Sequence, residues 1–536
     1  MHGHLKLKIL TNNMQIRFPT QKMKTIKYTK SLKNIQMYCK NALILASFIL
    51  LNCCKSDKSI YNVSISWEKV ITKSKTSLSI QVCPEPPMRR GHPASKNIYN
   101  ALRDIKINYA RLQPWYPFPR LSVAELEPPK ESKTYWDFSV IDPIVLDFFE
   151  ASEGRPVMVD FSTIPQWMIK TDKPVPYPAD PNEICWSYSP GNELRDTTMK
   201  ELVDYYHRLV SWYTKGGFTD EFGKFHRSGY NFKIDYWEVL NENDQDTQHL
   251  FSPQQLTKIY DAIVSDLQKL NPDMKFSALA LAFPQKGAPY FEYFLNSKNH
   301  KPGIPLDMFS YHTYIASDGN KWEDGAKLEK LQNLYFGKAD DFMKTVKNID
   351  SLKQRVSPDI KTYINELGIL PPGDPSDPNL VIPDYYWVLS SAVFAYLYPQ
   401  FVKAGIDIVA IAELVDYPGQ FAGTTLVDWN TGKPNARYRG MKLLVDNFGP
   451  GDNLIQTQDT PKDFLAQAFT TSDGTRKVLL VNKTNKEISV LVPTAEGAKM
   501  DFVDQSSGSN SPGSLELKTN KVRLSDYAVA VITLKK

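Results

Sequence analysis

Two Asn-Glu pairs are the residues of this sequence best placed to do chemistry. Asn241-Glu242 and Asn365-Glu366 each follow a short apolar run rich in β-branched or aromatic residues, so each glutamate is expected where a buried strand runs out into a loop. The two glutamates lie 124 residues apart (366 minus 242), which is about three units of a β/α barrel at roughly 30–40 residues a unit. Carboxylates at the ends of strands four and seven of such a barrel are what retaining glycoside hydrolysis needs.

The dipeptide by itself is a weak signal. It occurs twice more, at Asn182-Glu183 and Asn192-Glu193, among proline, glycine and aspartate residues that indicate loops. A single glutamate at a strand end is more often a surface residue or the partner of a buried arginine. Two such glutamates at barrel spacing, with the elements of a barrel around them, favour a catalytic pair.

The expected chemistry requires the two carboxyl groups to differ. One must stay ionised to attack the anomeric carbon, and the other must hold a proton, which needs desolvation or a nearby negative charge. The nucleophile supplies that charge and loses it when the glycosyl-enzyme forms, so the acid then acts as the base. Retention requires a separation of about 5–5.5 Å, whereas about 6.5–9.5 Å would indicate an inverting enzyme.

The elements that must position these residues alternate regularly between strands and helices. The expected strands are residues 77–83, 107–115, 156–162, 233–242, 275–282, 306–314, 360–366 and 406–414. The expected helices are residues 94–106, 140–154, 198–217, 252–272, 288–297, 336–354, 385–405 and 436–449. Because the strands are apolar without alternation, we expect both faces to be buried, as in a parallel barrel.

The character of the chain changes after the last of these helices. Residues 450–536 show short alternating strands and no helix, which predicts an antiparallel β-sandwich domain. The segment 60–76 is also strand-like and is expected to pack on that domain. The predicted fold is therefore α/β: a (β/α)8 TIM barrel over residues 77–449 with a C-terminal antiparallel β-sandwich.

The N-terminus accounts for the net charge of +5. Residues 1–36 hold eight Lys/Arg and no acid, so the rest of the chain is not basic and no nucleic-acid partner is expected. Residues 37–59 contain a basic start, a short apolar run and Cys53-Cys54, and they resemble a bacterial lipoprotein signal and tether. We expect Met37 to be the true start and residues 1–36 a mis-called upstream extension. Cys54 is the expected lipidated residue, with Cys53 as the alternative.

That signal predicts a membrane partner through an N-terminal lipid anchor. The expected location is the cell envelope, as a periplasmic or outer-membrane lipoprotein, with exposure at the cell surface left open. The alternative is an ordinary cleaved signal and secretion. No CxxC or Cys/His spacing is present, so we expect no metal site, no cofactor and no disulfide framework.

Further side chains with suitable chemistry lie at or near the expected strand ends. They are Arg111, Trp115, Asp160, Trp167, His312, Tyr314, Glu413 and Trp429. Several have structural alternatives: a pair between Arg111 and Glu238, a core role for His312, loop packing for Trp115 and Trp167, and hydrogen bonding inside the barrel for Asp160.

The chain resembles glycoside hydrolase family 39, in the clan of barrel glycosidases with catalytic glutamates on strands four and seven. The segments that carry this resemblance are ARLQPWYPFPRLSVAELEPP, YWDFSVIDP, DFSTIPQWM, YWEVLNE, FSYHTY, INELG and VDWNTGKPNARY. The resemblance implies that Glu242 is the acid/base and Glu366 the nucleophile. It also implies that Asn241 bonds the sugar 2-hydroxyl, that Tyr314 or His312 positions the nucleophile, and that Arg111 is its charge partner.

Two departures from the family pattern leave the sugar open. Many clan members carry a tryptophan at the end of strand eight, where this chain has Ala412-Glu413-Leu414. Trp429 could substitute for it, or Glu413 could bond a sugar hydroxyl or an amine. Asn365 also precedes the nucleophile where threonine or serine is commoner.

The expected function is retaining hydrolysis of O-glycosidic bonds in oligo- or polysaccharides by double displacement, with a carbohydrate as substrate. The alternatives are an inverting glycosidase and a non-catalytic glycan-binding lipoprotein on a degenerate barrel.

Overall fold

The computed structural model describes residues 60–316, 326–374, 377–458 and 461–535. These residues belong to one compact unit of the chain, Ser59–Lys536. The predictions for residues 1–36 and 37–59, including lipid attachment at Cys54, lie outside the described residues. Within the described part of the chain, we find no helix with the length and apolar character needed to cross a membrane.

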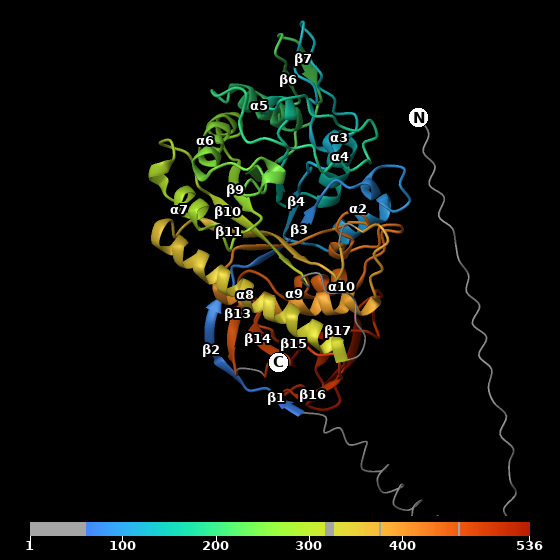
Figure 1. The fold of residues 1–536 in the computed structure, drawn as a ribbon. Helices are drawn as coiled ribbons and strands as arrows, with labels where there is room; N and C mark the ends of the chain where they lie inside the picture. The colour runs from blue at the N-terminus through green and yellow to red at the C-terminus, as the bar shows by residue number, and fades with distance from the viewer. Residues whose placement is uncertain (1–59, 317–325, 375–376, 459–460, 536) are drawn as a thin grey trace, which may run out of the picture. The chain divides into compact units, whose positions relative to one another are not determined.

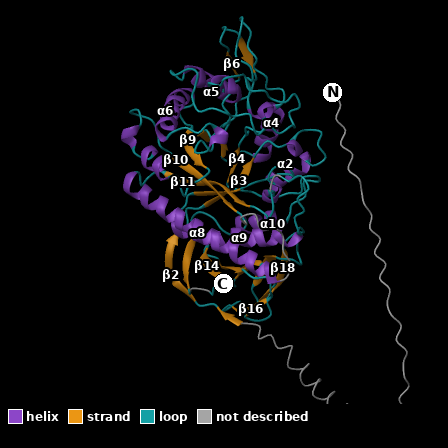
Figure 2. Ribbon diagram, in the orientation of Figure 1, coloured by secondary structure: helices purple, strands orange, loops and turns teal. Residues whose placement is uncertain are grey.

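Eight parallel strands close into a barrel, which confirms the predicted fold class (Figure 2). The strands are β3 (Ser77–Val82), β4 (Tyr109–Leu112), β5 (Val157–Val159), β8 (Tyr236–Val239), β9 (Lys275–Leu281), β10 (Met308–Ile315), β11 (Lys361–Ile369) and β12 (Ile408–Ile411). The barrel closes where β12 pairs with β3, with Ile411 opposite Ile80. Most strand residues are buried on both faces, as the continuous apolar runs predict.

Helices follow the barrel strands in the predicted order. They are α2 (Ser95–Asp104), α4 (Ile141–Ser152), α5 (Lys200–Thr214), α6 (Pro253–Leu270), α7 (Ala288–Phe294), α8 (Ala326–Val356), α9 (Asp384–Ala404) and α10 (Ala436–Val445). Helix α6 begins with a reciprocal capping box between Ser252 and Gln255, which satisfies two backbone donors that the first turn leaves free. Helix α8 begins at residue 326, ten residues before the predicted start at 336. In this additional part of the helix, Leu331 and Tyr335 lie four residues apart on one face, and both are buried.

The connections contain short elements that were not predicted. They are α3 (Pro119–Ser122), the hairpin β6 (Gly217–Thr219) and β7 (Phe225–Arg227), and the 3-10 helices η1 (Pro86–Met88), η2 (Gln166–Met168), η3 (Asp246–Gln248), η4 (Ser297–Asn299) and η5 (Ala422–Thr424). The helix expected to reach 217 ends at Thr214, because Gly217 instead starts the hairpin. The φ of Gly217 is +143°, and a Cβ at this position would lie 2.1 Å from the carbonyl oxygen of His226.

The C-terminal domain consists of two sheets. The larger has the order β18-β17-β20-β15-β14-β13-β2 and the smaller β1-β16-β19. Their strands are β1 (Ile60–Asn62), β2 (Ile65–Lys73), β13 (Asn453–Thr457), β14 (Phe464–Thr470), β15 (Arg476–Asn482), β16 (Ile488–Leu491), β17 (Lys499–Val503), β18 (Gly513–Glu516), β19 (Lys521–Leu524) and β20 (Val529–Thr533). The segment 60–76 contributes β1 and β2, which pair with β16 and β13. The β1–β16 pair is parallel, whereas the other pairs in the two sheets are antiparallel.

Helices α9 and α10 join the barrel to this domain (Figure 1). Helix α9 contacts β2, β13, β15 and β20, and α10 contacts β17. Helix α9 is buried on most of its circumference, as expected for a helix that is apolar on all sides. The rings of Phe448 and Phe469 pack at a tilt with 4.5 Å between centroids, and β-domain side chains such as Leu454 belong to the barrel's apolar core. The two parts therefore share a core.

Candidate active site

The two candidate catalytic glutamates face one cavity at the carboxyl ends of the barrel strands. Glu242 follows β8 by three residues, and Glu366 lies within β11. Both line a cavity of about 660 Å³, together with His312 and Tyr314 from β10. Active sites of β/α barrels form at this end of the strands. A carboxylate oxygen of each glutamate and a ring nitrogen of His312 all lie within 4.8 Å of one another.

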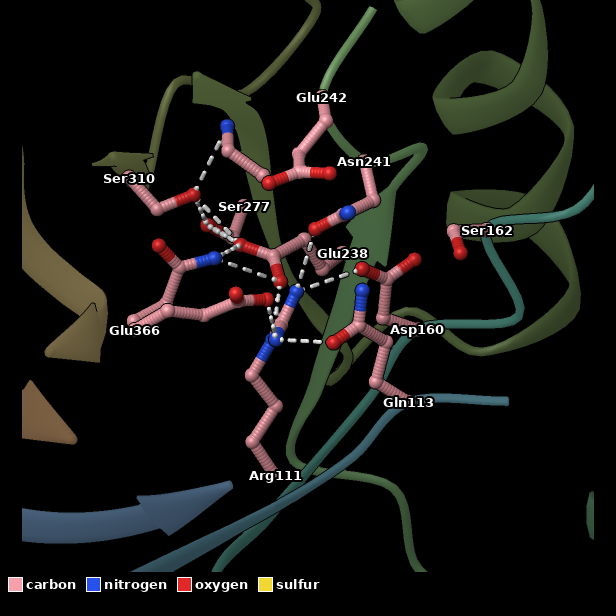
Figure 3. A network of polar contacts seen from close by, with 12 residues as sticks. Arg111, Gln113, Asp160, Ser162, Glu238, Asn241, Glu242, Ser277, Ser310 and Glu366 are labelled. Carbon is pink, nitrogen blue, oxygen red and sulfur yellow. Dashed lines mark hydrogen bonds and ion pairs between the residues drawn. The ribbon is translucent and has the colours of Figure 1, made fainter. Parts of the chain in front are cut away.

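Arg111 organises the floor beneath these residues (Figure 3). Its guanidinium is fully buried. It donates hydrogen bonds to Glu238 at 2.6 Å, Gln113 at 2.7 Å, Glu366 at 2.8 Å, and Asp160 and Asn241 at 2.9 Å each. The two interpretations of Arg111 therefore hold together: it pairs with Glu238 and also contacts the candidate nucleophile.

Two other acidic residues around Arg111, namely Glu238 and Asp160, have pKa values shifted in opposite directions. Burial acts to raise the pKa of Glu238, but the Arg111 guanidinium holds it below its ordinary value. Burial and the charge of Glu238 instead raise the pKa of Asp160 well above its ordinary value, even beside Arg111. Asp160 is a buried partner of Arg111 inside the barrel, and it is not among the described residues that line the cavity.

Glu366 is surrounded by donors. Tyr314 Oη donates to Glu366 Oε2 at 2.6 Å, and Gln81 Nε2 donates to Oε1 at 3.0 Å, in addition to the bond from Arg111. Tyr314 can approach because Gly368 stands opposite it in the β10–β11 pair, and a Cβ at Gly368 would lie 2.3 Å from the tyrosine ring. Two neutral donors and the Arg111 guanidinium therefore hold the carboxyl group of Glu366 in place.

Glu242 is held by two glutamine amides and His312 rather than by an arginine. Its side chain is buried, and burial with the charge of Glu366 raises its pKa, although contact with His312 lowers it in part. Gln245 Nε2 donates to Glu242 Oε2 at 2.7 Å, and Gln248 Nε2 also contacts that oxygen. The backbone φ of Glu242 is +55°, a left-handed conformation that costs about 1–2 kcal/mol for a residue with a Cβ and is concentrated at functional sites. A raised pKa suits a proton donor.

His312 lies between the two glutamates. Its Nδ1 is 3.0 Å from Glu242 Oε1 and 3.3 Å from Glu366 Oε2, and the side chain is fully buried. Burial lowers its pKa, but the two carboxylates outweigh this effect and leave it raised. The alternative of a core histidine bonded to the backbone is wrong, because its partners are the two candidate catalytic residues.

Asn241 and Trp115 also lie in the cavity. Asn241 Oδ1 accepts from Arg111, which leaves its buried Nδ2 without a hydrogen-bond partner among the described residues. That free donor is suited to a substrate hydroxyl. Trp115 packs edge-on against Trp186, with 5.4 Å between ring centroids, and lies 6.1 Å from the ring of Phe421. These three rings form an aromatic wall.

Trp167 and Trp429 do not line the cavity. The Nε1 of Trp167 donates to the carbonyl of Glu125 at 2.8 Å, and the Arg195 guanidinium lies over its ring, so the loop-packing interpretation is correct. Trp429 is half-buried against the barrel core, in a turn closed by pairing between Val427 and Pro434. It therefore does not replace the tryptophan expected after strand eight. Within the loop 163–195, it is Trp186 that reaches the cavity.

Glu413 does line the cavity, and it brings a second acidic group that the sequence did not reveal. Glu413, Glu85 and Asp416 each offer an oxygen within 4.8 Å of the others, and all three are buried. Among the described residues, this cluster and the group formed by Glu242, His312 and Glu366 are the two arrangements that could hold a metal ion.

Several lining residues were missed. They are Gln81, Cys83, Gln113, Tyr116, Trp186, Gln245 and Phe421. Gln81 and Gln113 could have been found, because each is a polar residue at the end of an otherwise apolar strand segment. Trp186, Gln245 and Phe421 lie in connections whose paths local sequence does not indicate.

Comparison with known proteins agrees with this architecture. The family model described as "D-apionate lactonase, C-terminal immunoglobulin-like domain" matches residues 461–532, and no curated protein matches the chain. A glucosidase from Croceicoccus marinus is similar, with 15% identity and a TM-score of 0.58 over 89% of this chain and 99% of that chain. A GH51 α-L-arabinofuranosidase from Thermotoga petrophila RKU-1 has 13% identity and a TM-score of 0.57 over 89% and 100%.

A third similar structure is a GH30 endoxylanase from Clostridium papyrosolvens C71, with 13% identity and a TM-score of 0.53 over 89% of this chain and 100% of that chain. Identities this low bear on the fold alone. The chain therefore has a TIM barrel with a C-terminal β domain, in the arrangement found in these barrel glycosidases.

Proposed function

We propose that this protein is a retaining glycoside hydrolase similar to family 39, with Glu366 as nucleophile and Glu242 as acid/base. The observation that carries the proposal is the contrast between two neighbouring carboxyl groups in one cavity. Glu366 accepts hydrogen bonds from the Arg111 guanidinium, Gln81 and Tyr314. Glu242 instead accepts from two glutamine amides and has a raised pKa. Oxygens of the two groups lie within 4.8 Å.

In the first step, Glu366 attacks the anomeric carbon while Glu242 protonates the leaving oxygen. The bond to Glu366 forms as the glycosidic bond breaks, which gives a covalent glycosyl-enzyme. The charge of Glu366 is then lost, and with it one cause of the raised pKa of Glu242. Glu242 can therefore act as base toward the water that releases the sugar.

The short distance also weighs against the inverting alternative. An inverting enzyme places a water between its carboxyl groups and needs about 6.5–9.5 Å. His312 contacts both glutamates, which is consistent with this short separation. The glycan-binding alternative gives no reason for the left-handed backbone conformation of Glu242 or for the raised pKa of its side chain.

A second candidate is hydrolysis of a sugar-acid lactone. It is favoured by the match of residues 461–532 to the C-terminal domain of a D-apionate lactonase. That match lies in the β domain, whereas the glutamate pair lies in the barrel. A cavity with ionisable carboxyl groups could also activate water for attack on a lactone carbonyl.

The configuration of the first sugar released decides between these candidates. Aryl β-glycosides of neutral sugars would be hydrolysed in the NMR tube, and we expect the β-anomer to appear before mutarotation produces the α-anomer. Initial release of the α-anomer would favour the inverting mechanism. Acid release from aldonolactones in a pH-stat, with no turnover of any aryl glycoside, would favour the lactonase.

A further inference from the structure

Three buried carboxyl groups stand together on one side of the cavity. Glu413 follows β12 by two residues and Glu85 follows β3 by three, and these two strands are paired. Asp416 lies three residues beyond Glu413. Their exposed fractions are 6% for Glu413 and 0% for the other two. Three carboxyl groups this close and this deeply buried need protons or a cation to balance them.

Nothing in the described part of the chain supplies that balance by direct contact. Gln420 Nε2 donates to Glu85 Oε1 at 2.9 Å, and Thr424 Oγ1 donates to Asp416 Oδ2 at 3.0 Å, but both donors are neutral. Arg437 is the nearby buried cation, and its guanidinium donates to backbone carbonyls, including those of residues 412 and 423. The acidic cluster of Glu85, Glu413 and Asp416 therefore has no ion-pair partner among the described residues.

Two buried donors in this region have no hydrogen-bond partner among the described residues: Arg437 Nε, and Nε1 of Trp115 in the cavity lining. Four buried acceptors around the cluster also have no partner there. They are Gln81 Oε1, Glu85 Oε2, Glu413 Oε2 and Gln420 Oε1. Gln81 is not part of the cluster, and it adjoins the reaction site because its Nε2 donates to Glu366. Of the four residues with free acceptors, Gln81 and Glu413 line the cavity, so their free acceptors favour an occupant that brings donors. An ammonium group carries three donors, no acceptor and a positive charge.

We propose that Glu413, with Asp416 beside it and Glu85 behind it, forms a subsite for an ammonium group on the substrate, so that the preferred substrates are glycosides of sugars with a free amine. This inference rests on the proposed glycosidase function. Glu413 and Asp416 line the cavity that contains Glu242 and Glu366, so a sugar over the catalytic pair is within reach of them.

Other occupants fit this wall less well. A neutral sugar hydroxyl needs one acceptor and leaves the negative charge unbalanced, and a sugar carboxylate would be repelled. A bound Ca²⁺ takes six to eight oxygen ligands, which is more than the three carboxyl groups provide if each contributes one oxygen. An ammonium group requires only three acceptors, and Glu413, Asp416 and Gln81 line the cavity with acceptor oxygens.

The empty cluster must hold protons that the ammonium group displaces. Burial raises the pKa values of Glu85, Glu413 and Asp416. The charge of Asp416 raises those of Glu85 and Glu413 further. The titratable groups that face the cluster are Cys83, Tyr314 and Tyr417, whose pKa values are also raised, and Arg437 is the charged one. Binding of an ammonium sugar should therefore release protons into the buffer.

The test compares three 4-nitrophenyl β-D-glucosides: the 2-amino-2-deoxy compound, its N-acetyl derivative and the parent glucoside. We expect kcat/KM to be at least tenfold higher for the free amine than for the other two. In Glu413→Gln the ratio of amine to glucoside should fall at least tenfold, and Asp416→Asn, a second variant, should lower it too. Glu496→Gln, an exposed residue of the β domain, should keep the wild-type ratio.

Calorimetry of glucosamine binding in two buffers of different ionisation enthalpy should show proton release in the wild-type protein and less in Glu413→Gln. An equal or higher kcat/KM for the parent glucoside would overturn the inference and leave the glycosidase proposal intact. A Tm raised by Ca²⁺ alone in the wild-type protein but not in Glu413→Gln would also overturn it in favour of a metal site. Turnover of none of the three compounds would count against the glycosidase proposal itself.

Discussion

Replacing Glu242 by alanine should separate the two steps of the proposed reaction. The variant loses the buried carboxyl group that Gln245 and Gln248 hold beside Glu366, while Glu366 keeps its own donors. General acid catalysis contributes about 10²–10⁴ in rate, or roughly 3–5 kcal/mol of barrier. For a methyl glycoside or a disaccharide, whose leaving group needs the proton, kcat/KM should therefore fall at least a hundredfold.

A 2,4-dinitrophenyl glycoside gives a different result, because its leaving group departs without a proton. Here kcat/KM for Glu242→Ala should stay within about tenfold of the wild-type value, while kcat falls because the glycosyl-enzyme waits for a base. Azide should restore kcat and give the glycosyl azide of retained configuration. The matched control is Glu183→Ala, which removes an exposed glutamate from another Asn-Glu pair and should change neither constant. Equal losses on both substrates would refute the assignment of Glu242.

Three further outcomes follow from the site. Burial raises the pKa of Glu242, which must be protonated to act as the acid. A pH profile should therefore show kcat/KM unchanged at pH values just above the ordinary pKa of glutamate and declining only as pH rises through the raised pKa. Arg111→Met should destabilise the fold by about 3–5 kcal/mol in urea unfolding, since buried carboxylates lose their counterion, whereas Arg90→Met removes an exposed pair worth about 0–1 kcal/mol. Trp186→Ala should raise KM at least threefold, while an unchanged KM is expected for Trp167→Ala; the reverse would contradict the mapping of the cavity.

Much of the barrel could be predicted because its signals are local. Each parallel strand is buried on both faces, so segments such as KFSALALA are apolar throughout and stand out between amphipathic helices. The placement of Glu242 and Glu366 near one rim then follows from the chain order, since the carboxyl ends of parallel strands meet there. Glu366 was expected to end its strand, but β11 runs three residues beyond it. The same logic identified Arg111, His312 and Tyr314, which are strand residues.

The loops could not be predicted in this way. Trp167 and Trp186 belong to one Pro-rich connection, and only the folded path shows that Trp167 packs under Arg195 while Trp186 reaches the cavity. Gln245 and Gln248 bond Glu242 through a turn after β8 that polar sequence alone does not define. The acidic cluster was partly visible as Glu413, but Glu85 joins it only because β12 closes onto β3.

Covalent labelling of Glu366 tests the central claim most directly. A 2-deoxy-2-fluoro glycoside with a 2,4-dinitrophenyl leaving group slows both steps but forms the glycosyl-enzyme faster than it is hydrolysed. We predict one fluoroglycosyl group per protein by mass spectrometry, attached at Glu366 in the peptide that contains YINELG. Attachment at another carboxyl group, or hydrolysis of this compound with no adduct at any time, would contradict the account.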